Sequence, residues 1–127
     1  MNQLNYASLE ACKRLVDAGI VLETEKVWFF STTGWELVDR YDKHKVNKHY
    51  LPAPSMAEVW RELPAEYQTK TKHLQLQIDK IKRNDGVIVT SANYIYNDEE
   101  SGCCVYKFYA NENPTDALID LLIFVRK

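Results

Sequence analysis

The stretch HLQLQIDKIKRNDGVIVTSANYIY, residues 73–96, decides the fold class of this chain. Apolar and polar side chains alternate through its first half, which predicts a half-buried β-strand. The leucines and isoleucines also fit helical spacing, so a helix is the alternative for residues 73–82. The strand is favoured because Asn-Asp-Gly at 84–86 makes a hairpin turn into VIVTSANYIY, a segment rich in β-branched and aromatic residues.

A third strand is expected after the polar turn NDEESG, in the segment CCVYKFYA at 103–110. Alternation assigns its residues to two faces. The face that we expect to be buried comprises Cys104, Tyr106, Phe108 and Ala110, and the other comprises Cys103, Val105, Lys107 and Tyr109. Three consecutive strands joined by short turns predict an antiparallel meander.

Strands are also predicted earlier, in IVLETEKVWFFSTTGWELV at 20–38. The turn Ser-Thr-Thr-Gly at 31–34 separates one or two strands before it from one strand after it. The sequence VWFF is apolar on both faces. It belongs either to a central strand or to a strand with an exposed aromatic patch.

Two helices are predicted before the meander. Apolar residues three and four apart indicate the first at 8–18, and a glycine follows it. A second, short helix lies within YLPAPSMAEVWRELP at 50–64. Two prolines keep the chain extended at its start, Ser55 and Glu58 form a capping box, and Pro64 ends the helix.

The last helix is expected in the C-terminal segment NPTDALIDLLIFVRK. Pro114 suits the first helical position, with Asn113 or Thr115 as the cap. Ile119 and Ile123 add apolar surface on a second side of this helix. It is therefore either sandwiched or in contact with another subunit.

Together these elements predict a single α+β domain over residues 1–127. We expect an antiparallel sheet of about five strands, with the N- and C-terminal helices packed on one face and the short middle helix at an edge or on the remaining apolar surface. A chain of 127 residues is long enough to bury a self-sufficient core.

The composition argues against several classes of protein. A net charge of −2 gives no overall attraction to nucleic acid. No segment approaches the roughly 20 apolar residues that span a bilayer, and the N-terminus MNQLNYASLE lacks the features of a signal peptide. Three cysteines, two of them adjacent, do not suggest a disulfide framework. We therefore expect a cytoplasmic protein.

Three blocks occur along the chain in the order YASLEACKRLVDAGIVLET, PAPSMAEVWRELP and NPTDALIDLLIFV. This ordering resembles a group of small phage and prophage proteins of gut bacteria, in which such blocks surround a variable middle. The resemblance implies an origin in a virus or mobile element and a setting in the host cell cytoplasm. It implies no activity, cofactor or catalytic residue.

The connection at residues 39–50, which contains RYDKHKVNKHY, is a candidate ligand site. Its basic residues could attract phosphate while its tyrosines stack on a base, as in proteins that hold nucleotides or single strands. The candidate residues are Arg40, Tyr41, Lys43, Lys45, Lys48 and Tyr50. A solvated surface loop is the other interpretation.

Catalytic chemistry has less support in the sequence. His44, His49 and His73 lack the spacing of a metal site, so no metal or other cofactor is expected. Cys103 would be a nucleophile only beside a base, for which His73 is the candidate, and packing within a strand is the alternative. No glycine-rich phosphate loop is present in the sequence.

Large apolar side chains supply the remaining candidates. Aromatic residues dominate protein cores, but they are also typical of protein interfaces. The candidate interaction residues are Trp28, Phe30, Trp35 and Trp60, with Ile119 and Ile123 expected to be exposed. The leading hypothesis is an accessory protein that acts by binding rather than catalysis, either to a host or phage protein or as a homodimer. A nucleotide- or ligand-binding module using the basic loop is the first alternative, and a cysteine-dependent enzyme the second.

Overall fold

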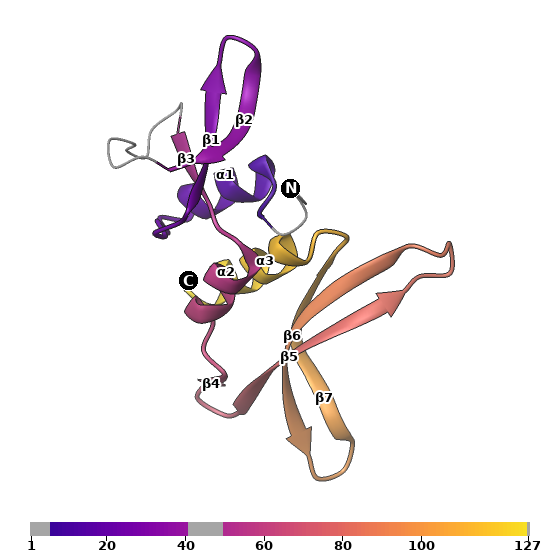
Figure 1. The fold of residues 1–127 in the computed structure, drawn as a ribbon. Coiled ribbons are helices and arrows are strands. Elements are labelled where there is room, and N and C mark those ends of the chain that lie inside the picture. The colour runs from indigo at the N-terminus through magenta and orange to yellow at the C-terminus, as the bar shows by residue number, and fades with distance from the viewer. Residues whose placement is uncertain (1–5, 41–49, 127) are drawn as a thin grey trace.

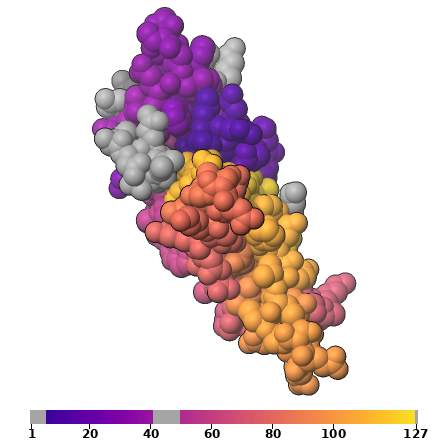
Figure 2. Space-filling view, turned by 90° about the vertical axis from the view of Figure 1, so that its right-hand side faces the viewer, coloured from indigo at the N-terminus to yellow at the C-terminus, as the bar shows by residue number. Residues whose placement is uncertain are grey.

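The computed structural model describes residues 6–40 and 50–126. Three helices lie between two antiparallel sheets (Figure 1). The molecule is elongated, with the N-terminal strands at one end and the last strand at the other (Figure 2). The α+β class is confirmed. The strands are divided between one sheet of three and one of four, where the sequence predicted about five in a single sheet.

The smaller sheet has the strand order β2-β1-β3. Strands β1 (Lys26–Ser31) and β2 (Gly34–Asp39) form a hairpin, and β3 (Tyr50–Ala53) pairs with the other side of β1. Pro52 lies in β3 opposite Val27. A proline cannot donate to a ladder, which suits β3 to the edge of a sheet. Helix α1 (Leu9–Asp17) packs on this sheet through β3.

The larger sheet has the order β4-β5-β6-β7. Its strands are β4 (Glu66–Gln68), β5 (His73–Lys82), β6 (Ile88–Asp98) and β7 (Gly102–Asn111). Residues 75–82 of β5 each pair with a residue of β6, so the strand prediction is confirmed and the helical alternative is wrong. The antiparallel meander over β5, β6 and β7 is confirmed as well.

A short helix, α2 (Met56–Glu62), carries the chain from one sheet to the other. Its predicted capping box is confirmed: the Ser55 hydroxyl accepts from the Glu58 amide at 3.2 Å, and the Ser55 amide donates to the Glu58 carboxylate at 2.8 Å. After the helix, the Pro64 carbonyl accepts a hydrogen bond from the buried Tyr94 hydroxyl of β6 at 2.7 Å. The helix with prolines on either side thus follows the last strand of the smaller sheet, and the hydrogen bond at Pro64 fixes the chain to the larger sheet.

The C-terminal helix α3 (Pro114–Val125) is sandwiched between other elements. It contacts β6 and β7 on one side and α1 and α2 on others. Its fully buried apolar residues are Ala117, Leu118, Ile119, Leu121 and Leu122. The expectation that Ile119 is exposed is therefore wrong, because two layers cover this helix. Ile123 is partly buried against the same core.

Polar contacts join α3 to the N-terminal segment. The Asp116 carboxylate accepts from the Ser8 amide at 2.8 Å, although Ser8 itself caps α1. Arg14 of α1 donates to Asp120 at 2.9 Å. Asn113 caps α3, accepting from the Thr115 amide at 2.9 Å. Burial raises the pKa of the Asp116 carboxyl above its ordinary value of 3.8, against the lowering effect of the Ser8 hydrogen bonds.

A β-bulge in β7 changes which of its side chains lie on each face, so the faces predicted from the sequence are partly wrong. Tyr94 pairs with Lys107 and Ile95 with Val105, so Tyr106 has no residue opposite it on β6. Such an extra residue shifts the alternation of side chains. Tyr106 and Lys107 both face α3, at 6.3 and 5.6 Å from the Phe124 ring.

Beyond this bulge the alternation of β7 is reversed relative to the sequence prediction. Phe108 and Ala110 lie on the face away from α3, and Tyr109 packs on the core. The prediction that Phe108 and Ala110 are buried in the core is thus wrong, because the alternation cannot be counted through the bulge.

Replacing Ile119 by alanine tests the sandwiched position of α3. We expect Ile119→Ala to lower the free energy of unfolding by about 2–5 kcal/mol, since a fully buried side chain is removed. The same change at Ile81, which is 43% exposed in β5, should cost less than about 1 kcal/mol. Urea unfolding of both variants measures the difference, and equal losses would contradict the burial of α3 on both sides.

The raised pKa of Asp116 predicts a pH dependence of stability. A carboxyl that binds its proton more tightly in the folded state stabilises the fold below pH 3.8, and this contribution is lost as the pH rises through the raised pKa. Asp116→Asn keeps an oxygen for the Ser8 amide but cannot ionise. The free energy of unfolding of the wild type, relative to this variant, should fall as the pH is raised from acid to neutral. A difference that stays constant or grows would contradict the prediction.

Candidate binding surface

The four-stranded sheet has one face turned away from the helices. Residues of the opposite face, such as Leu76, Ile78 and Tyr94, belong to the core shared with the helices. Cross-strand pairing assigns the alternate residues to the uncovered face. This outer face comprises Gln75, Gln77, Asp79 and Ile81 of β5, Val89, Ser91, Asn93 and Ile95 of β6, and Val105, Phe108 and Ala110 of β7.

Large apolar side chains on the outer face are exposed. Phe108 and Val105 of β7 are both 56% exposed, and Ile81 of β5 is 43% exposed. An antiparallel sheet with one solvated face usually carries polar residues there. The outer face departs from this pattern, because β5 and β7, the neighbours of β6, both expose apolar side chains on it. Exposed apolar side chains of this kind are characteristic of a surface that contacts another molecule.

A polar cluster occupies the middle of the outer face. The Ser91 hydroxyl donates to the Asn93 side-chain oxygen at 2.6 Å, and the Asn93 amide group donates to Asp79 at 3.1 Å. Ser91 is 2% exposed and Asn93 5% exposed. The long side chain of Gln77 lies 3.5 Å from the other oxygen of Asp79. The cluster therefore holds β5 and β6 in register with its polar groups bonded to one another.

A hollow of about 440 Å³ lies at one end of this sheet, between the first residues of β5 and the last residues of β6. Its lining includes Lys72, His73, Tyr96 and Asp98. The Lys72 ammonium lies 4.2 Å from the Tyr96 ring, and His73 contacts Gln68 at 2.9 Å. The two basic side chains of the hollow thus have partners within the protein.

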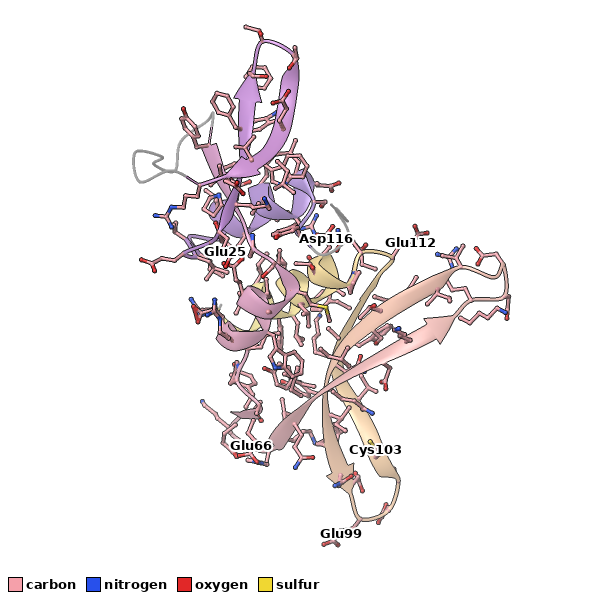
Figure 3. The ribbon with its side chains drawn as sticks, viewed as in Figure 1. Glu25, Glu66, Glu99, Cys103, Glu112 and Asp116 are labelled. Atoms are coloured by element: carbon pink, nitrogen blue, oxygen red, sulfur yellow. The ribbon has the colours of Figure 1, made fainter. Side chains whose placement is uncertain are left out.

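Cys103 and His73 are separated by β6. Both residues lie at the end of the sheet that holds the β6–β7 turn. Cys103 is on β7 and His73 is on β5, so two strand spacings, about 10 Å, separate them. The His73 ring is turned toward β4, where its other nitrogen lies 3.4 Å from Glu66. Figure 3 shows Glu66 and Cys103 on different strands at this end. The geometry does not support the predicted thiol–imidazole pair.

The predicted aromatic residues do not form one surface. Trp28 donates to the Ala7 carbonyl at 2.9 Å, and both Trp28 and Trp35 pack against the core beside α1. Phe30, 45% exposed, contacts the Trp35 ring at 5.2 Å between centroids. Trp60 is 47% exposed on α2, apart from the others.

Two of the six residues predicted in the basic loop lie within the described chain. Arg40 is exposed, and its amide donates to the Glu25 carbonyl at 2.9 Å. Tyr50 begins β3 and stacks on Phe29 at 5.0 Å between ring centroids. The other four lie outside the described residues: Tyr41, Lys43, Lys45 and Lys48. A phosphate site in this loop stays a prediction.

Sequence reasoning missed the residues of the outer face. Val105 was assigned to the correct side of β7, but Phe108 was assigned to the core because the bulge at Tyr106 has no sequence signature in a single chain. Ser91 and Asn93 did carry a signal. They alternate with Ala92 and Tyr94 along β6, as expected of a strand with one polar face.

Comparison of the chain with protein-family models, with curated proteins and with solved structures finds no match in any of the three. The phage or prophage origin implied by the resemblance therefore stays a prediction. Within residues 6–40 and 50–126, no helix is long and apolar enough to cross a membrane. The same residues contain no group of three metal-ligating side chains.

The separation of Cys103 from His73 makes a prediction about thiol reactivity. Burial raises the pKa of the Cys12 thiol to about 12, whereas Cys103 is exposed. We expect iodoacetamide to label Cys103 in the folded protein and Cys12 only after denaturation. His73→Ala should leave the labelling rate of Cys103 within about twofold, since no imidazole activates this thiol. Peptide mass spectrometry over time measures both rates, and a large slowing by His73→Ala would restore the catalytic interpretation.

Proposed function

We propose that the protein acts by binding another polypeptide through the outer face of its four-stranded sheet. The observation that carries the proposal is the exposure of Phe108, Val105 and Ile81 on a sheet face that the described helices leave uncovered. Exposed aromatic and branched side chains around a desolvated centre are the usual components of a protein interface.

The charge of the outer face supports a polypeptide over a nucleic acid. Among the residues that form this face, Asp79 is the one charged side chain. A phosphate backbone would meet a carboxylate here, and affinity for nucleic acid comes mainly from lysine and arginine. Apolar side chains of a partner would instead cover Val105 and Phe108 without a charge to neutralise.

The polar cluster supports the same conclusion. Asp79, Ser91 and Asn93 bond to one another, so part of their hydrogen-bonding capacity is already met within the protein when a partner covers them. The apolar side chains around the cluster supply the area that binding removes from water. The partner could be a host or phage protein in the cytoplasm, as the resemblance implies, or a second copy.

Substitutions on two separate exposed surfaces test the proposal. Tagged wild-type protein would be used to isolate partners, and each identified partner would then be purified and its dissociation constant measured. We expect Phe108→Asp to weaken binding at least about tenfold, because hot-spot aromatics dominate such interfaces. Trp60→Ser, on α2, is the matched control and should change it less than about twofold.

Both variants should unfold within about 1 kcal/mol of the wild type, because both side chains are exposed. A partner lost in Trp60→Ser and retained in Phe108→Asp would move the interface to α2. A thermal shift with nucleotides at low salt, together with no polypeptide partner, would favour the basic loop instead.

A further inference from the structure

We propose that the open edge of β7 accepts an extended, basic segment of a different polypeptide as an additional strand of the larger sheet. This contact goes beyond the proposed function, because an added strand lengthens the outer face rather than covering it. Strand β7 is the last strand in the order β4-β5-β6-β7. Within the described residues, β6 is the one strand that pairs with it, so ten residues, about 33 Å of backbone, line the open edge.

This edge lacks the residues that usually prevent pairing. Natural edge strands are protected by charges, by prolines or by being short. Strand β7 contains one charged residue in ten, Lys107, and no proline. The Lys107 side chain faces α3, with its ammonium 5.6 Å from the Phe124 ring. An exposed edge of this kind is where an extended peptide adds to a sheet through main-chain hydrogen bonds.

The apolar exposure of β7 belongs to the strand rather than to one face of the sheet. Val105 and Phe108 are 56% exposed on the outer face. Tyr106 is 42% exposed on the opposite face, with its ring 6.3 Å from the Phe124 ring. A partner that rests on the outer face leaves Tyr106 in water. A strand beside β7 carries side chains on both faces, so it contacts all three residues.

The charges at the two ends of β7 define the chemistry of the added segment. Asp98, Glu99 and Glu100 come just before the strand and Glu112 just after it, and all four are exposed. Figure 3 shows Glu99 and Glu112 at opposite ends of the strand. No described residue forms an ion pair with any of these carboxylates. Lysine or arginine at both ends of the segment would therefore complement the edge.

The same charges argue against pairing between the β7 edges of two copies. In an antiparallel pair each Glu112 would meet the acidic turn of the other copy, and in a parallel pair the two acidic turns would lie together. Lys80 and Lys82 do not offset this repulsion, because they lie on β5, two strand spacings or about 10 Å from β7 and farther from an added strand. The occupant that fits is a basic segment from a different polypeptide.

A synthetic peptide tests the site on the full chain. The probe has blocked termini, two lysines at each end, and about eight alternating valine and threonine residues between them, so it matches the length of β7. We expect it to bind at low salt, and replacement of its lysines by glutamate should weaken binding at least about tenfold. N-methylation of two adjacent central residues removes a donor from each edge of the peptide. This change should also weaken binding at least about tenfold, whichever edge faces β7.

Substitutions in the protein test the acidic ends. Glu99→Gln with Glu100→Gln should weaken binding of the lysine peptide about fivefold at low salt, because two exposed charges of the site are removed. Glu23→Gln with Glu25→Gln is the matched control, since these two carboxylates are also exposed but precede β1 of the smaller sheet. The control should change the dissociation constant less than about twofold. Equal effects of the two double variants would overturn the assignment of the ends.

Hydrogen exchange locates the peptide. The amides of β7 should exchange more slowly when the peptide is bound, while those of β2, an edge of the smaller sheet, should not change. Absence of binding, equal binding of the glutamate or N-methylated peptide, or protection confined to other strands would each overturn the site. A polypeptide that still binds the outer face and is lost in Phe108→Asp would uphold the proposed function while the edge site fails.

Discussion

The burial of α3 on both sides is the constraint on which the rest of the structure depends. Its sequence from Pro114 to Val125 contains two charged residues, Asp116 and Asp120, and the protein supplies a partner for each. The rest of the helix is apolar around most of its circumference, so it cannot lie on a sheet with one face in water. The larger sheet and both other helices pack against this one element, and the smaller sheet is joined to it through α1.

This arrangement explains why a face is left uncovered. One helix of 12 residues is about 18 Å long and can cover only part of a sheet whose strands are ten or eleven residues long. Helix α3 covers the side of β6 that carries Ala92 and Tyr94, while α1 and α2 are occupied by the smaller sheet and by α3. The described helices thus leave the outer face of the larger sheet to solvent or to another molecule.

Local rules predicted the local elements well. The capping box at Ser55, the cap at Asn113 and the hairpin around Gly86 each depend on a few neighbouring residues, and each is present in the structure. The division into two sheets could not be predicted in this way. It depends on which strands β3 and β5 pair with, β1 for β3 and β4 and β6 for β5, and neither strand's own composition specifies those partners.

The candidate surface shows the same limit. Ile119 and Phe108 are both large apolar residues at positions where a simple period was applied, and both were assigned to the wrong environment. For Ile119 the sequence left two alternatives, a sandwiched helix or contact with another subunit, and the structure has the sandwiched helix, in which Ile119 is fully buried. For Phe108 the error came from a single unpaired residue at Tyr106 that reversed the alternation. Such errors change which side chains meet a partner, although they leave the fold class unchanged.

The polar cluster connects the stability of the larger sheet to its proposed binding. Asp79, Ser91 and Asn93 lie at the centre of the outer face, and hydrogen bonds join them to one another in the absence of a partner. A one-residue slip of β5 against β6 would separate Asp79 from Asn93 and leave buried polar groups unpaired, so the cluster opposes alternative registers. The apolar side chains around it are therefore held in one arrangement before binding. A partner then meets a preorganised surface, and less conformational entropy is lost when the complex forms.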